Sequence, residues 1–221
     1  MNIASYIDHT LLKQTTQLRE IEQLCIEADE HGFTAICVPP SYIDATRKRI
    51  QKKEVKIATV VGFPFGYTTL EAKAEETKQC LMKKADEIDM VAPIYAILNE
   101  DWGFVEKEIA AIEHLVHREG AVLKVIIESG ILSDAQIIQC CAICAKLGVD
   151  FVKTSTGFAE KGASVHAVQL MRKHLPASVK IKASGGIRSF DFASELIAAS
   201  ADRLGCSAGV QIVQEAGEKV F

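Results

Sequence analysis

Positions 150–158 offer the first hint of chemistry, because they read DFVKTSTGF, an apolar run that ends in Lys153 and continues into small residues. Burial favours the neutral form of a lysine, so a lysine in a run that must be buried is usually paired or functional. The alternative is a lysine at a strand end whose stem lies along the core while its ammonium reaches water. The stretch alone leaves both interpretations of Lys153 open.

Other polar residues also stand at or near the ends of apolar runs, namely Asp8, Cys37, Asp89, Glu128 and Lys182. The two-residue repeat of a strand points Asp89, Lys153 and Lys182 away from their apolar neighbours. Lys124 falls on the same inner face of its own run. These side chains therefore predict a cluster of charges that must compensate one another.

A buried acid beside two lysines is compatible with an ion network that has only a structural role. It is also the arrangement that imine chemistry needs, because two neighbouring ammonium groups depress each other's pKa. A lysine tuned to a pKa of about 7–8 is neutral often enough to attack a carbonyl. We therefore favour Lys153 as a Schiff-base nucleophile.

Two further segments end predicted strands with small residues and lead into helices: ASGGIR at 183–188 and GCSAG at 205–209. Glycines there let backbone amides approach an anion, and the amino terminus of a helix favours its negative charge. Either cluster alone is a weak signal, since tight turns need glycine anyway. Together they predict a phosphate pocket, to which Gly157 could add a third side.

The elements that would hold these residues alternate regularly along the chain. Short runs rich in Val and Ile take turns with longer segments of helical periodicity, which is typical of repeated βα units. The predicted strands are 6–8, 33–38, 56–61, 87–91, 122–127, 151–153, 179–183 and 203–205. The predicted helices are 17–31, 42–52, 69–84, 102–118, 134–147, 164–174, 190–200 and 208–216.

Eight such units in 221 residues predict an α/β fold, the (β/α)8 or TIM barrel, as one catalytic domain over residues 1–221. A doubly wound open sheet of this length would usually have fewer strands. Helix starts are indicated at Thr68 with Glu71 and at Ser133 with Gln136, and helix ends at Gly32 and Gly148. A barrel would gather the strand-end residues at one face.

Composition excludes several classes of protein. The net charge is −4 with no basic block, which argues against nucleic acid and anionic membranes as partners. We find no leader-like start and no stretch long enough to span a bilayer, so we expect a cytoplasmic protein. Seven scattered cysteines favour reduced thiols, and the spacing of Cys141 and Cys144 fits a helix better than a redox motif. No histidine pattern indicates a metal site.

Six segments in order along the chain closely resemble the deoxyribose-phosphate aldolase family. They are IDHTLL at 7–12, VGFP at 61–64, DEIDMV at 86–91, LKVIIE at 123–128, FVKTSTGF at 151–158 and IKASGGIR at 181–188. The resemblance implies a class I aldolase that needs no cofactor or metal. Its implied reaction is the reversible cleavage of 2-deoxy-D-ribose 5-phosphate into acetaldehyde and D-glyceraldehyde 3-phosphate.

The resemblance also implies roles for individual residues. Lys153 is similar to the Schiff-base lysine, Lys182 to the neighbouring ammonium that lowers its pKa, and Asp89 to the acid that relays protons through a water. The implied phosphate-binding residues are Gly157, Gly185, Gly186, Gly205 and Ser207. Asp8 and Thr10 would lie nearer the sugar hydroxyls, and Cys37 would face the pocket, where aldehyde products could attack it.

Some positions depart from the family pattern. Phe221 ends the chain where many members have a tyrosine that helps to move a proton. Cys206 replaces a common threonine or alanine, and Lys84 and Ser200 each replace a usual glycine.

Two other functions on the same barrel stay open, a phosphosugar isomerase or epimerase and a phosphosugar-binding protein without catalysis. The expected partners are small phosphosugars and aldehydes, and a homo-oligomer, either a dimer or a tetramer, is compatible with the sequence.

Overall fold

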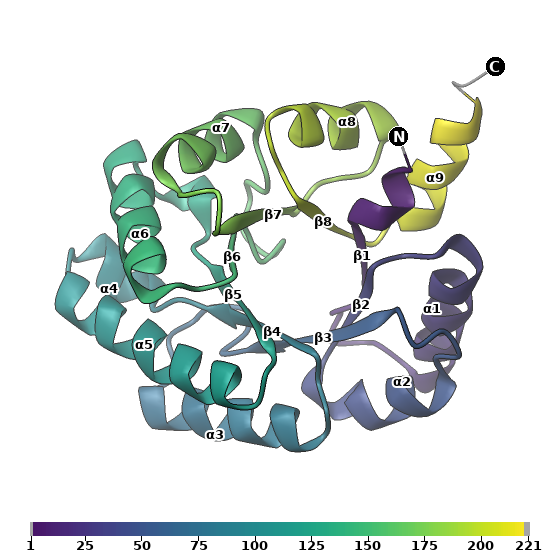
Figure 1. Cartoon of the computed structure of the whole chain (residues 1–221), viewed down its shortest axis with the longest axis horizontal. Helices are drawn as coiled ribbons and strands as arrows, with labels where there is room; N and C mark the ends of the chain where they lie inside the picture. The colour runs from purple at the N-terminus through teal and green to yellow at the C-terminus, as the bar shows by residue number, and fades with distance from the viewer. Residues whose placement is uncertain (1, 219–221) are drawn as a thin grey trace.

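The computed structural model describes residues 2–218 and shows a closed barrel of eight parallel strands. Figure 1 looks into the ring of strands, with the helices arranged around its outside. Neighbours in sequence are neighbours in the barrel, and β8 pairs with β1 to close it. The strands are β1 (Ile7–Thr10), β2 (Ala35–Val38), β3 (Lys56–Val61), β4 (Glu87–Val91), β5 (Val122–Ile126), β6 (Phe151–Lys153), β7 (Lys180–Ser184) and β8 (Arg203–Cys206). The predicted (β/α)8 fold is confirmed.

Each predicted helix is present, with small shifts at the ends. The helices are α1 (Leu18–His31), α2 (Ile43–Arg49), α3 (Leu70–Met82), α5 (Trp102–Arg118), α6 (Asp134–Leu147), α7 (Val165–His174), α8 (Phe190–Ala198) and α9 (Gly209–Glu218). A short helix α4 (Ile94–Leu98) follows β4 and was not predicted. Three 3-10 turns at Ile3–Tyr6, Pro40–Tyr42 and Ser129–Ile131 were also missed.

The first strand begins later than the sequence suggested. The apolar residues Ile3, Ala4 and Tyr6 form a 3-10 turn, and Ile3 and Ala4 are buried there. Pairing therefore starts at Ile7 with β8 and at Asp8 with β2. Apolar character alone could not separate this buried turn from the strand that follows it.

Local capping explains most of the helix ends. Ser133 and Gln136 form the predicted reciprocal cap of α6, and Gly32 and Gly148 end α1 and α6 in the left-handed conformation. The start of α3 was predicted one residue too early. The capping side chain is Thr69, which accepts a hydrogen bond from the amide of Ala72, rather than Thr68.

Two different environments lie on the two faces of the strands. The outer faces pack aliphatic side chains such as Ile36, Ile57 and Ile88 against the helices, all of them fully buried. The inner faces carry charged side chains that are equally buried, among them Asp8, Asp89, Lys124 and Lys182. The barrel is therefore held from outside by apolar burial, and its interior depends on charge compensation.

Within residues 2–218 no helix is both long enough and apolar enough to cross a membrane.

Lys84 and Ser200 occupy left-handed backbone positions, with φ values of 63° and 81°. A side chain costs roughly 1–2 kcal/mol in this conformation, and glycine escapes the cost. We expect Lys84→Gly to stabilise the protein by about 0.5–1 kcal/mol after the extra chain entropy of glycine is subtracted. Denaturant unfolding of the purified variant measures this change.

The matched control is the neighbouring Lys83→Gly, since Lys83 has a φ of −78° at the end of α3. Glycine there relieves no strain, so this variant should lose about 0.5–1 kcal/mol. Equal effects of the two substitutions would contradict the proposed strain at Lys84.

Candidate active site

Six charged side chains form a closed ring inside the barrel, with positive and negative groups in alternation. Around the ring the ion pairs follow the order Asp8, Arg203, Glu87, Lys124, Asp89, Lys182 and back to Asp8. We call this set the six-charge ring. Its three carboxylates and three cations come from five strands, β1, β4, β5, β7 and β8. Alternation along each strand points them all toward the barrel axis.

Distances in the ring are those of strong charge-assisted contacts. Lys124 Nζ lies 2.5 Å from Glu87 Oε2 and 2.8 Å from Asp89 Oδ1. Lys182 Nζ lies 2.7 Å from Asp89 Oδ2 and 2.5 Å from Asp8 Oδ2. Arg203 closes the ring between Asp8 and Glu87, at 3.1 Å from the latter. Every member therefore has two partners of opposite charge.

Lys153 is not a member of this ring but forms an ion pair with one of its members, Asp89. Its Nζ lies 2.7 Å from Asp89 Oδ2, the oxygen that Lys182 also contacts. Among the residues that the structure describes, this is the one carboxylate in ion-pair contact with Lys153. The predicted group of Asp89, Lys153 and Lys182 is therefore brought together, and its two amines share one acceptor.

The pKa values of the two lysines are shifted in opposite directions. Burial and the positive charge of Lys182 outweigh Asp89 and lower the pKa of Lys153 below its usual range. Burial also favours a neutral Lys182, but Asp8 and Asp89 outweigh it and hold the pKa of Lys182 well above its ordinary value. The sequence-based expectation that the two amines depress each other's pKa is therefore correct for Lys153 and wrong for Lys182.

Asp89 is the shared anion of the site. Burial alone would raise the pKa of this carboxyl group, but Lys124, Lys153 and Lys182 together hold it well below its usual range. The carboxylate accepts from Lys124 on one oxygen and from Lys153 and Lys182 on the other. Asp89 is thus fixed in one orientation as an ionised group.

A cavity of about 270 Å³ opens above Lys153 at the carboxyl ends of the strands. It is lined by the glycine-rich loops after β6, β7 and β8, which bring Gly157, Gly185, Gly186, Gly205 and Ser207 to one place. Lining residues that the sequence did not single out include Lys13, Thr156, Phe158 and Arg188. The cavity joins an amine to loops whose amides and nearby cations suit a phosphate.

Glycine at position 205 is required by a close approach. A Cβ atom there would lie 2.9 Å from Lys182 Cε and 3.0 Å from Ser184 Cβ. Gly185 and Gly186 have φ values of 87° and 79°, which favour glycine for conformational reasons. The loop after β7 is therefore shaped by backbone demands, and the end of β8 by the packing of a ring lysine.

Glu128 holds the loop after β6. Its carboxylate accepts hydrogen bonds from the amide and the hydroxyl of Thr156, at 3.2 Å and 2.5 Å from Oε2. Phe158 then donates its amide to Thr156 Oγ1 at 3.1 Å. Burial raises the pKa of Glu128. Glu128 thus positions the segment that carries Gly157.

The remaining predicted residues have different surroundings. Thr10 lines the cavity, whereas Asp8 is not among the lining residues and is fully buried between Lys182 and Arg203. Cys37 is fully buried beside Ala58 and Val60, and burial raises the pKa of its thiol. Phe221 lies outside the described residues.

Sequence analysis missed the site role of Arg203. The signal was a charged residue opening the short apolar run RLGC, on the same strand face as Gly205. Within residues 2–218, no cluster of three or more His, Cys, Asp or Glu side chains is suited to hold a metal ion.

Comparison with known proteins identifies relatives over almost the whole chain. Residues 2–215 match the model of the DeoC/LacD family aldolases. The chain is 46% identical over 216 residues to the deoxyribose-phosphate aldolase of Caldanaerobacter subterraneus subsp. tengcongensis, covering 97% of this chain and 94% of that one. It is 42% identical to the enzyme of that name from Lactococcus lactis subsp. lactis, covering 97% and 96%.

Solved structures give the same result. The tetrameric deoxyribose phosphate aldolase from Aeropyrum pernix superposes with a TM-score of 0.90 at 32% identity, covering 99% of this chain and 92% of that one.

Removing the shared anion should destabilise the fold strongly. Asp89→Asn leaves three buried amines short of a counter-charge, so we expect a loss of about 3–5 kcal/mol in the free energy of unfolding at neutral pH. Because the folded-state pKa of Asp89 is depressed, this stabilisation is present above the unfolded pKa of about 3.9 and fades as pH falls further. Denaturant unfolding between pH 3 and 7 measures it.

Asp44→Asn is the control, because Asp44 is 60% exposed and lies 4.0 Å from Lys83. Its effect should stay within about 0.5 kcal/mol. A similarly small effect at Asp89 would show that the interior charges do not compensate one another.

Proposed function

The chain belongs to the DeoC/LacD family of aldolases, and we propose that it reversibly cleaves 2-deoxy-D-ribose 5-phosphate into acetaldehyde and D-glyceraldehyde 3-phosphate. One observation carries the proposal. An amine with a lowered pKa, Lys153, stands at the base of a cavity whose rim is built from the glycine loops after β6, β7 and β8. This cavity offers a nucleophile for an aldehyde carbon and a place for a phosphate on the same small substrate.

Lys153 is the proposed nucleophile. Its neutral amine attacks the C1 aldehyde of the sugar, and loss of water from the carbinolamine leaves an iminium ion. When the C2–C3 bond breaks, its electron pair moves to the iminium nitrogen and gives an enamine. Protonation at C2 and hydrolysis then release acetaldehyde and restore the amine.

Lys182 and Asp89 are the proposed partners in this chemistry. The elevated pKa of Lys182 keeps it an ammonium, so its charge disfavours a second proton on Lys153. The C3 hydroxyl must lose a proton as the bond breaks, and Asp89 acts on it through a water. Because the pKa of Asp89 is depressed, the carboxylate passes this proton on rather than retaining it.

Gly157, Gly185, Gly186, Gly205 and Ser207 are proposed to surround the phosphate group. Their backbone amides and the amino terminus of α9 suit an anion, and Arg188 and Lys13 line the same cavity. Thr10 borders the cavity where a sugar hydroxyl would lie. For Asp8 we propose that it acts on the substrate only through Lys182, and for Cys37 that it stays a neutral thiol beneath the amine.

We further propose that residues 1–221 act as one catalytic barrel domain in the cytoplasm. All seven cysteines are free and buried, which supports a reducing compartment. A homo-oligomer, dimer or tetramer, is proposed on the precedent of the tetrameric relative from Aeropyrum pernix.

Reductive trapping tests the nucleophile. Incubation with acetaldehyde and borohydride should leave an N-ethyl group on Lys153, located by peptide mass spectrometry, and should abolish turnover. Lys153→Ala should remove both the adduct and at least about 10⁴-fold of the activity, because the amine that forms the imine is gone. A label on Lys124 or Lys182 would contradict the assignment. Retained activity in Lys153→Ala would also contradict it and would favour an isomerase or epimerase, which needs no imine. Turnover should also survive a chelator.

Substrate truncation tests the phosphate end. Unphosphorylated 2-deoxyribose should be cleaved with a kcat/KM lower by at least about 100-fold, because the binding energy of the remote phosphate is lost in the transition state. Inorganic phosphate should inhibit competitively in a coupled assay. If the phosphorylated and unphosphorylated sugars react equally well, the glycine loops do not bind phosphate. Binding without any turnover would indicate a non-catalytic barrel.

A further inference from the structure

No member of the six-charge ring lines the substrate cavity above Lys153. Three of them, Glu87, Lys124 and Arg203, form consecutive ion pairs on one side of the ring. The ring of Phe151 lies among them, with its centroid 5.9 Å from both Lys124 Nζ and Arg203 Cζ. The proposed reaction gives these three buried charges no task. We call them the deep charges.

We propose that the deep charges Glu87, Lys124 and Arg203 are positioning residues that make Lys153 the amine that gives up its proton. The inference rests on the proposed function of Lys153 as the imine-forming amine. It adds that the protonation of this amine is set by a ring that extends to the opposite end of the barrel.

Charge counting within the closed interior supports this role. The six-charge ring holds three carboxylates and three cations, so it is neutral without Lys153. A proton on Lys153 gives the buried group of seven a net charge of about +1, and loss of that proton restores neutrality. An uncompensated charge is costly in such an interior.

The ion-pair contacts determine which lysine loses its proton. Lys124 lies between Glu87 and Asp89, and Lys182 lies between Asp8 and Asp89, each within 2.8 Å of both partners. Lys153 contacts Asp89 alone and shares that oxygen with Lys182. Lys153 is also the one of these three amines that lines the substrate cavity.

Other titratable groups near Lys153 do not supply the missing counter-charge. The groups that face it are Cys37 from β2, Asp89 from β4, Lys182 from β7 and Glu128 beyond β5. Asp8 and Lys124 lie one contact further, and Glu87 and Arg203 lie two contacts further. The thiol of Cys37 is kept neutral by burial. Glu128 directs its carboxylate to Thr156.

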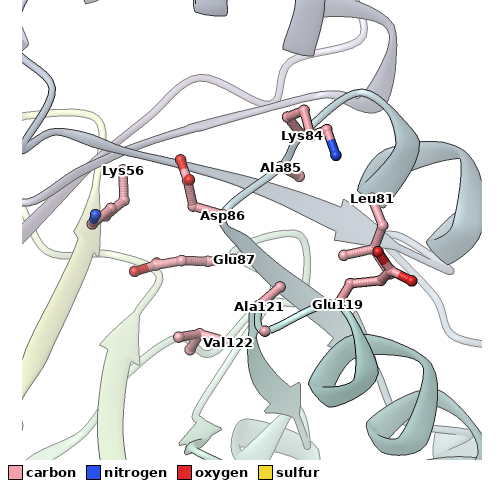
Figure 2. Close-up of a pocket in the computed structure, with 10 residues that line it drawn as sticks. Lys56, Leu81, Lys84, Ala85, Asp86, Glu87, Glu119, Ala121 and Val122 are labelled. Carbon is pink, nitrogen blue, oxygen red and sulfur yellow. The ribbon is translucent and has the colours of Figure 1, made fainter.

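Glu87 allows the ring to be altered at a position away from the substrate cavity. Glu87 lines a separate cavity of about 350 Å³ at the amino-terminal ends of β3, β4 and β5. Figure 2 shows its side chain extending from the start of β4, with Lys56 and Asp86 on one side and Val122 on the other. Glu87→Gln keeps the shape of this side chain and removes its charge.

The experiment measures the pKa of Lys153 directly. Each full-length variant is treated with trace formaldehyde and cyanoborohydride across a pH series, and methylation of Lys153 is followed by peptide mass spectrometry, with exposed Lys53 as internal reference. Lys124→Met removes a positive charge and should shift the Lys153 profile to higher pH by about one unit. Glu87→Gln removes a negative charge and should shift it to lower pH by a similar amount.

The double variant Lys124→Met with Glu87→Gln leaves the net charge unchanged and should return the profile close to that of the wild type. Lys124→Arg keeps the charge and should leave the profile in place. If Lys124→Met does not fold, as judged by its thermal melt, Arg203→Gln removes a cation from the same ring and should give the same upward shift.

Opposite shifts with recovery in the double variant would establish the role. Shifts in one direction for both single variants, or an unmoved profile in folded variants, would overturn it, because a purely structural ring would lower stability without moving the profile in a charge-dependent way. The labelling does not depend on sugar turnover. A wild-type protein inactive on deoxyribose 5-phosphate but with these shifts would refute the proposed substrate alone.

Discussion

Charge neutrality inside a closed barrel is the constraint on which the rest of this structure depends. The ring side chains are almost completely buried, so each carboxylate must meet cations and each cation must meet carboxylates. The six-charge ring satisfies this condition by alternation. Lys153 is an additional amine beside this balanced set, and a proton on it adds a buried charge without a separate counter-charge. The lowered pKa of Lys153 follows from its burial and from this balance.

The barrel places the balanced charges inside the ring of strands and the cavity at the carboxyl ends of the strands. Strand alternation aims the charged residues inward while aliphatic neighbours such as Ile36 and Ile88 fasten the strands to the helices. The carboxyl ends of the strands then carry the loops that surround the cavity. Gly205 links the two systems, since it borders the cavity and also leaves room for the stem of Lys182. The cavity and the contacts of the inner lysines therefore share the same strand ends.

Much of this arrangement could be predicted from the sequence. The alternation of strands and helices indicated the barrel, and the position of Lys153, Lys182 and Asp89 within their runs indicated a shared interior. The loops after β7 and β8 could be recognised because glycine marks both turns and anion sites. What could not be predicted depends on pairing across the barrel. Arg203 meets Asp8 over 195 positions of sequence, and no local pattern reports such a contact.

The opposite pKa shifts of Lys153 and Lys182 show the same limit. Both lysines stand at or near the ends of short apolar runs, and the strand pattern points both inward. The difference arises because Lys182 reaches Asp8 on β1 as well as Asp89 on β4, whereas Lys153 reaches Asp89 alone. The register of β7 and β8 against β1 decides this, and register is a property of the assembled barrel.

The contact between Asp8 and Arg203 also has a consequence for how the protein is made. Asp8 leaves the ribosome 195 positions before Arg203. A nascent chain that lacks β8 must keep the acids of β1 and β4 solvated, so its barrel stays open until β8 has been made. The surroundings that lower the pKa of Lys153 are therefore not complete on the growing polypeptide before that point.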